Sequence, residues 1–267
     1  MAAEYTANAE ASTLQESIIQ VKHVYMQRGF KINNILMDGQ FVCIRGDLTV
    51  LHINMNICSN NKHVGEIEQL NCTVKERVRG IYNTIYFKIL PGRMVVYLVA
   101  LVIFWVNAIT PPPSVGRNLS PPHIITGLTI EYTKHCRLQF GEYTQVYKYH
   151  DNTMQERTTR AIALRPTRNA QGAYFFMSLT TDRRLNRLSF NPPPLPQDVI
   201  NSVHCLARAA IPEVSTSETG IGAHSLGLRT GPTMTTTIPP TLRRMITTAT
   251  TTMKVTTMRV METTTST

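Results

Sequence analysis

The chain has 267 residues and a formal net charge of +10. Only 16% of its residues are charged and 42% are hydrophobic, so it carries enough apolar material for the core of one or two domains. This balance excludes collagen, a long coiled coil and a wholly disordered chain. The surplus of positive charge favours an anionic partner, nucleic acid first and an anionic membrane second.

The cysteines and histidines indicate no metal or disulfide framework. Five cysteines lie far apart and none forms a C-x-x-C pair, a pattern typical of reduced, buried thiols. The histidines lack H-x₃₋₅-H spacing, so we expect surface or hydrogen-bonded side chains. The first residues have no basic start and no apolar stretch, and no signal peptide is expected.

The first region, residues 1–109, alternates helical and strand-like patterns. Apolar side chains at helical spacing predict a helix that ends at Gly29, and a short strand follows that ends at Asp38. This order of elements predicts an α/β layer with helices packed on a sheet. The remaining expected elements are a short helix within 40–53, a strand near 53–59, a helix over 66–85 and an apolar helix over 94–108.

The second region, residues 110–203, opens with a Pro-rich connection that cannot continue a helix. It continues with short runs such as QFGEYTQVYKY, RTTRAIALRP and AYFFMSL, which have the length and composition of strands in a small antiparallel sheet or barrel. The third region, residues 204–267, ends in a stretch with 17 Thr among its last 38 residues. We expect this third region to be a disordered low-complexity tail.

Two carboxylates stand where a metal site can form. Asp38 ends a predicted strand, and Glu68 lies near the start of a predicted helix. Carboxylates in these positions can converge on one edge of a sheet and hold Mg²⁺ or Mn²⁺, which prefer hard oxygen ligands. Two such ions support phosphoryl transfer by activating a nucleophile and stabilising the leaving oxygen. The alternative is a turn Asp and a solvated helix Glu without a shared ligand.

The residues around these carboxylates resemble those of copia-type retrotransposon integrases. LMDGQF is similar to the strand end that carries the family's second catalytic aspartate. EIEQLNCTVKERVR is similar to its glutamate helix, G-x-A-E-R-x-N-R-T-x-x-E-x-A-R, with Glu68 in the catalytic place. FWVNAITPP, LSPPHIITG and LQFGEYTQVY resemble later elements of the family in the same order. ALRPTRNAQGAYFFMSLTTDRRLNRLSF resembles the small β module that follows the core.

This resemblance implies an α/β fold: a truncated ribonuclease H-like integrase core over residues 1–109, a small β-rich module over 110–203 and a disordered Thr-rich tail. It implies metal-dependent strand transfer with Mg²⁺ or Mn²⁺ held by Asp38 and Glu68. The family uses a third carboxylate on an earlier strand, but no Asp lies upstream of Asp38. Gln69 and Cys72 replace two arginines of the motif. We therefore expect a degenerate, catalytically inactive fragment in which at most one cation binds weakly.

One alternative hypothesis is a non-catalytic DNA-binding module, and self-association is a further expected partner interaction. The predicted helix over 66–85 carries Lys75, Arg77 and Arg79. The β-rich module carries Arg157, Arg160, Arg165, Arg168, Arg183, Arg184 and Arg187. Arginines of this kind can follow the phosphates of DNA without reading its sequence, and we assign this role to Arg183, Arg184 and Arg187 and to the helix residues. The alternative is solvated arginines, since no aromatic residues are interleaved with them.

The other alternative, which ranks ahead of the DNA-binding module, is a single-pass membrane protein that crosses the bilayer through residues 94–109, MVVYLVALVIFWVNAI. This run is shorter than the ~20 residues that span a ~30 Å hydrocarbon core, and it contains Asn107. A buried core helix is therefore the favoured interpretation. The expected localisation is nuclear or cytoplasmic, with the membrane as the alternative.

Overall fold

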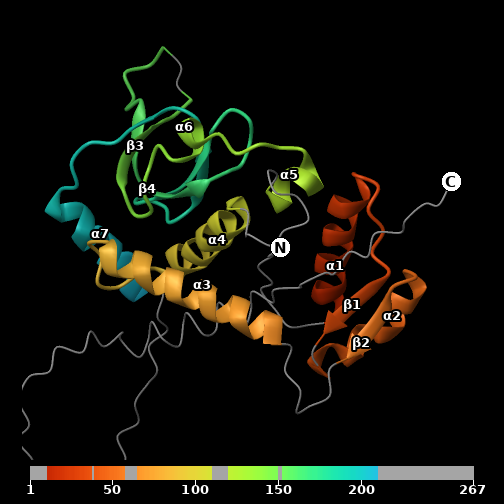
Figure 1. Cartoon of the computed structure of the whole chain (residues 1–267). Coiled ribbons are helices and arrows are strands. Elements are labelled where there is room, and N and C mark those ends of the chain that lie inside the picture. The colour runs from red at the N-terminus through yellow and green to blue at the C-terminus, as the bar shows by residue number, and fades with distance from the viewer. Residues whose placement is uncertain (1–10, 38, 58–64, 110–119, 150–151, 210–267) are drawn as a thin grey trace, which may run out of the picture.

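The structure is a computed structural model that describes residues 11–37, 39–57, 65–109, 120–149 and 152–209. Figure 1 shows an N-terminal unit of short helices and strands, and a second part in which helices pack against a rolled sheet. Asp38 and the residues from 210 onwards lie outside the described residues. The predicted tail from residue 210 is therefore not described by the structure.

The N-terminal unit follows the predicted order of elements. Helix α1 (Ala11–Met26) precedes strand β1 (Asn34–Met37), and a 3₁₀ helix η1 (Gly39–Ile44) leads into α2 (Arg45–Val50) and β2 (Asn54–Ile57). The two strands pair in parallel, with Asn34 opposite Asn54. A parallel pair needs a crossover connection, and η1 with α2 supplies it.

The core of the N-terminal unit comes from side chains at helical and strand spacing. Leu14 and Ile18, four residues apart on α1, pack with Ile35 of β1 and with Ile44 and Leu48 of the crossover. Ile35, Ile44 and Leu48 have no exposed surface. A two-stranded sheet is marginal by itself, so this packing is what holds the unit together.

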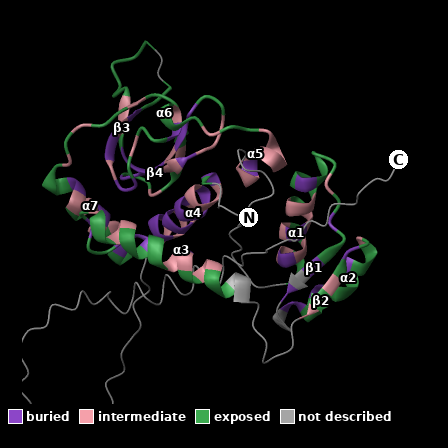
Figure 2. Cartoon of the chain, viewed as in Figure 1, coloured by how far each residue is buried: buried purple, intermediate pink, exposed green. Residues whose placement is uncertain are grey.

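Two long helices connect the N-terminal unit to the sheet. Helix α3 (Gly65–Thr84) buries Val74 and Val78, which are four residues apart and therefore share one face. Helix α4 (Gly92–Ala108) begins directly after Pro91 and is apolar on nearly all sides. It lies between α3 and the sheet, so both of its faces meet protein (Figure 2). Among the described residues, no helix has the length and apolarity needed to cross a bilayer, and the membrane alternative gains no support.

The second part contains a five-stranded antiparallel sheet in the order β6-β5-β4-β3-β7. Its strands are β3 (Tyr143–Tyr147), β4 (Thr158–Pro166), β5 (Tyr174–Ser178), β6 (Arg184–Arg187) and β7 (Phe190–Asn191). The first four strands pair in chain order, and β7 returns to pair with β3. The predicted small antiparallel sheet is confirmed, and the chain as a whole is of the mixed α/β class.

The central strands β4 and β5 are buried on both faces, because each face packs against a different group of apolar side chains. On β4, Ile162 and Leu164 face α4, while Ala161 and Ala163 face a separate cluster with Phe176. Burial on both faces explains why residues 161–164 of β4 are apolar without a break, whereas a strand with one solvated face alternates apolar and polar residues.

Three short helices were not predicted. They are α5 (Pro121–Thr126), α6 (Tyr132–His135) and α7 (Gln197–Ala209). Helix α7 buries Val199 and Val203 against the helix–sheet core. It runs past the expected boundary at 204, so residues 204–209 belong to a packed helix rather than to a tail.

The cysteine interpretation needs correction. No disulfide joins cysteines within the described part of the chain, and the cysteines there are exposed rather than buried. Cys72 illustrates the reason, because it lies on the side of α3 away from Val74 and Val78. The exposed cysteines are Cys43, Cys72, Cys136 and Cys205, and Cys58 lies outside the described residues.

Candidate nucleic-acid interface

The predicted metal site falls partly outside the described residues. Glu68 lies in the first turns of α3 with an exposed side chain, whereas Asp38 is not described. The distance between their carboxylates is therefore not defined by the structure. Within the described residues, no group of three or more His, Cys, Asp or Glu side chains is placed to hold a metal ion.

The basic residues of α3 lie on two flanks of the helix. Since Val74 and Val78 point into the core, Lys75 and Arg79, four residues apart, share one flank of the solvent side. Arg77 lies on the other flank, and the side chains of Arg77 and Arg79 are exposed. These three residues thus present positive charge to solvent in two directions rather than as one row.

The arginines of β6 also divide between two faces. Arg184 pairs with Met177, whose side chain packs on the α4 side of the sheet, and Arg187 pairs with Tyr174, whose side chain packs on the other side. Residues three apart on a strand point to opposite faces. The predicted set Arg183, Arg184 and Arg187 therefore does not form one continuous surface.

Arg184 instead joins a cluster of arginines and aromatic rings on the α4 side. Its guanidinium carbon lies 5.0 Å from the Phe175 ring centroid, and that of Arg165 lies 5.1 Å from the same ring. Arg184 Nη1 donates to the hydroxyl oxygen of Tyr97 on α4 at 3.2 Å. Arg165 also lies 5.9 Å from the Tyr97 ring centroid. We call Tyr97, Arg165, Phe175 and Arg184 the arginine–aromatic cluster.

An irregularity in β4 explains how Arg165 reaches this cluster. The register of β4 against β5 shifts between Ala163 and Arg165, so that Arg165 stands opposite Phe175. A bulge of this kind lets two consecutive residues approach the same face of the sheet. Leu164 fills the core under α4, and Arg165 follows it on the same side with its charged end against two rings.

Arg168 extends the positive charge of the cluster. It stands in the loop between β4 and β5 with φ +71°, in the left-handed region that side chains other than glycine rarely adopt. Its Nε and Nη2 are buried and have no hydrogen-bond partner among the described residues. Burial lowers its pKa.

Arg165 interacts electrostatically with Tyr97, Arg184 and Arg168. Burial lowers its pKa, and although Tyr97 opposes that effect, Arg184 and Arg168 lower it further. Its Nε is also buried without a hydrogen-bond partner in the described part of the chain. Arginine stays charged in proteins, so the lowered pKa reports an unfavourable environment and not a neutral side chain.

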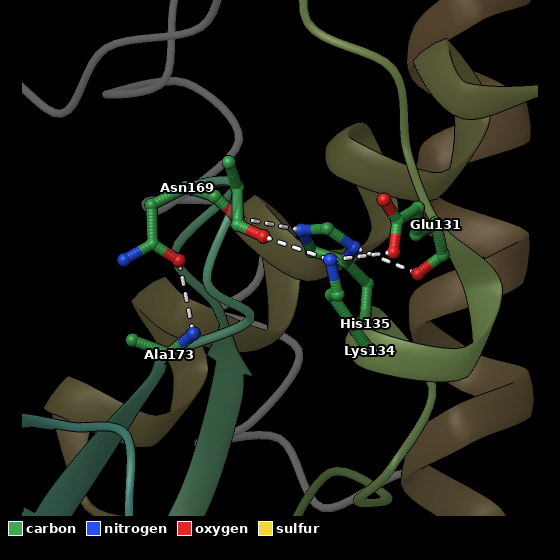
Figure 3. A network of polar contacts seen from close by, with 6 residues as sticks. Glu131, Lys134, His135, Asn169 and Ala173 are labelled. Carbon is green, nitrogen blue, oxygen red and sulfur yellow. Dashed lines mark hydrogen bonds and ion pairs between the residues drawn. The ribbon is translucent and has the colours of Figure 1, made fainter.

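A network of polar contacts holds the loop that carries Arg168 (Figure 3). His135 of α6 is buried, with Nδ1 2.8 Å from the Glu131 carbonyl oxygen and Nε2 3.2 Å from the Asn169 carbonyl oxygen. Lys134 Nζ bonds the Glu131 carboxylate at 2.7 Å and also donates to the Ala170 carbonyl at 3.3 Å. Within the loop, the Asn169 side chain accepts from the backbone N–H of Ala173 at 2.9 Å. His135 is thus a hydrogen-bonded histidine, as expected.

Carboxylates are paired elsewhere. Asp198 of α7 bonds Arg160 at 2.8 Å, and Asp182 lies 3.6 Å from Arg93 at the start of α4. Among the described residues, no aspartate or glutamate forms an ion pair with Arg165, Arg168 or Arg184. The positive charge of these three side chains is therefore uncompensated within that part of the chain.

A cavity of about 730 Å³ adjoins the cluster between the helices and the sheet. Its lining is mainly apolar and includes Leu101, Trp105, Phe140 and Tyr143. Arg165 is the only guanidinium among the lining residues that the structure describes. Arg165 therefore lines this cavity, while its guanidinium group lies against the Tyr97 and Phe175 rings.

Sequence reasoning included Arg165 and Arg168 among the basic residues of the β module but did not single them out. It missed Tyr97 entirely, and it found no aromatic residues interleaved with the arginines. The interleaving exists in three dimensions, because α4 brings Tyr97 and β5 brings Phe175 to the arginines of β4 and β6. One local feature could have indicated an aromatic ring on this face. Side chains alternate along a strand, so Phe175 must point to the side opposite Tyr174 and Phe176.

Comparison with protein-family models and with curated proteins finds no match to this chain.

Proposed function

We propose that this chain binds nucleic acid through the phosphate backbone, without reading its sequence, and that it is a non-catalytic relative of copia-type integrases. The observation that carries the binding proposal is the positive charge of Arg165 and Arg184 beside two aromatic rings, with Arg168 in the following loop, none of which forms an ion pair among the described residues. Phosphates neutralise such charges and release counterions, which is the main source of non-specific affinity for DNA. Planar guanidinium groups are well suited to phosphate oxygens.

The relationship to integrases rests on the resemblance and on the order of elements. A partial ribonuclease H-like core implies a particular order of elements. The N-terminal part of the chain has a helix, a strand, a crossover and a second parallel strand, and two long helices follow. A small antiparallel β module then follows, as the resemblance also implies. In this proposal, Asp38 and Glu68 are remnants of the catalytic set, with at most weak binding of Mg²⁺ or Mn²⁺. The chain acts in the nucleus or cytoplasm, where its partner is DNA.

The test is a titration of a fluorescent DNA duplex at several salt concentrations. We expect the logarithm of the association constant to fall linearly with the logarithm of salt concentration, by about 0.9 for each phosphate neutralised. Two duplexes of equal length and different sequence should bind equally. The variant Arg168→Gln/Arg184→Gln should have a shallower slope than the parent.

Arg160→Gln is the matched control, because Arg160 already pairs with Asp198 and its loss should change the slope little. Affinity that does not respond to salt would contradict the proposal. So would a double variant that binds as the parent does, since the charges of Arg168 and Arg184 would then take no part in binding.

A further inference from the structure

The guanidinium groups of Arg165 and Arg184 lie beside the same ring although they repel one another, and Arg168 stands in the loop that follows β4, three residues after Arg165. Arg184 and Arg165 stand over the same Phe175 ring, at 5.0 and 5.1 Å from its centroid. Arg168 is close enough to Arg165 to lower the pKa of that side chain. Like charges that are partly removed from water destabilise a fold unless a counter-charge is present.

The fold nevertheless holds these side chains in place. Arg168 keeps a left-handed backbone conformation that costs an L-residue free energy, and the loop around it is fixed by Asn169 and by His135. Strained residues of this kind cluster at ligand sites, where the surrounding structure imposes them.

The unsatisfied atoms define what the site lacks. Arg165 Nε and the Nε and Nη2 of Arg168 are buried donors without an acceptor among the described residues. The Tyr97 hydroxyl accepts from Arg184, and because a phenol hydroxyl both accepts and donates, it still has a proton to donate. Guanidinium donors that outnumber acceptors around Arg165 and the Tyr97 hydroxyl favour an acceptor-rich anion.

We propose that Arg165, Arg168, Arg184 and the Tyr97 hydroxyl form a discrete site for one phosphate group. A phosphate has several acceptor oxygens and pairs with guanidinium groups in a bidentate manner. The phosphate is a phosphodiester of the nucleic-acid backbone, and in this respect the site rests on the proposed function. Unlike the dispersed charges of Lys75, Arg77 and Arg79 on α3, this site is saturable and takes a single phosphate without any base.

The experiment is thermal unfolding of the full chain in inorganic phosphate and, separately, in thymidylyl-thymidine, which has one phosphodiester. Chloride at matched ionic strength is the reference. A ligand that binds only the folded state raises Tm, so roughly thirty-fold excess over the dissociation constant should raise it by about 5 °C. We expect both ligands to raise Tm and to compete with each other.

Arg168→Gln and Arg184→Gln should lose most of this rise in Tm. Arg160→Gln, which removes an arginine that is paired with Asp198, should keep it. If Arg165→Gln does not fold, the other two variants still decide, since Arg184 is exposed and Arg168 lies in a loop. No rise in Tm with phosphate, or an equal rise in the Arg168 and Arg184 variants, would overturn the site.

The two ligands separate the sources of the phosphate. A rise with inorganic phosphate but not with thymidylyl-thymidine would overturn the assignment to the nucleic-acid backbone. Salt-dependent duplex binding without any phosphate effect on Tm would leave the proposed function in place and refute the site. If phosphate raises Tm but the chain binds no duplex, the phosphate site stands and the proposed function is refuted.

Discussion

The Nε2 of His135 lies 3.2 Å from the carbonyl oxygen of Asn169, which joins helix α6 to the loop between β4 and β5. The opposite ring nitrogen lies 2.8 Å from the Glu131 carbonyl oxygen. The imidazole thus spans two backbone acceptors in a buried position. Because Asn169 follows Arg168 in the chain, this contact helps to set the direction in which Arg168 enters the cluster.

Replacing His135 with leucine should destabilise the fold. The change removes the hydrogen bond between the buried imidazole and a backbone carbonyl, although both carbonyls keep a backbone N–H donor, so we expect a loss of about 0.5–1.5 kcal/mol. Urea denaturation followed by circular dichroism would give the change in the free energy of unfolding. His23→Leu is the control, since His23 is exposed on α1, and equal stabilities for the two variants would contradict the structural role of His135.

Replacing Arg168 with glycine should stabilise the chain relative to replacement with alanine. Both changes remove the guanidinium, but only glycine accepts φ +71° without strain, and the difference should be about 1 kcal/mol. Chemical denaturation of the two variants, monitored by the single tryptophan, Trp105, measures this difference directly. An alanine variant as stable as the glycine variant would show that the backbone at 168 is not strained.

Stability should fall in alkaline solution. Burial raises the pKa of Tyr25 above its ordinary value of 10.0, so the folded state holds this proton more tightly than the unfolded state does. The protonated Tyr25 phenol therefore contributes to the free energy of unfolding in full below about pH 10, and this contribution is lost as pH rises through the folded-state pKa. Tyr25→Phe should reduce the loss measured by denaturation between pH 9 and pH 11.

Tyr149→Phe is the matched control for this pH dependence, because the Tyr149 side chain is 95% exposed. Tyr25 packs edge-on against Phe30, and phenylalanine retains that contact. A pH profile of Tyr25→Phe that coincides with that of the parent would mean that this phenol does not contribute.

The purified chain should not join DNA ends in the presence of Mg²⁺ or Mn²⁺. The reason is the ligand count, since the resemblance calls for three carboxylates and this sequence has no Asp upstream of Asp38. The assay follows strand transfer and end processing of a labelled duplex. Joining that Asp38→Asn abolishes would overturn this prediction and point to a replacement ligand elsewhere in the chain.

The sequence alone predicted most elements with strong local signals. The periodicity of Leu14 and Ile18 predicted α1, and the β-branched and aromatic runs predicted β3, β4 and β5. The apolar run of α4 indicated a buried helix by its length alone. These features depend on residues close in the chain, and for that reason they can be recognised without the fold.

The tertiary structure decided where the charges meet. Arg165, Phe175 and Arg184 come from three strands and Tyr97 from a helix, and the register shift in β4 turns Arg165 toward them. Local sequence carries no signal for such a shift or for the packing of α4 on the sheet. The short helix α6 was missed for the same reason, because contacts with distant segments stabilise it rather than local propensity. Helix α7 was missed although Val199, Val203 and Ala207 follow one another at helical spacing. The composition indicated a basic protein, and only long-range packing gathered part of that charge beside two rings.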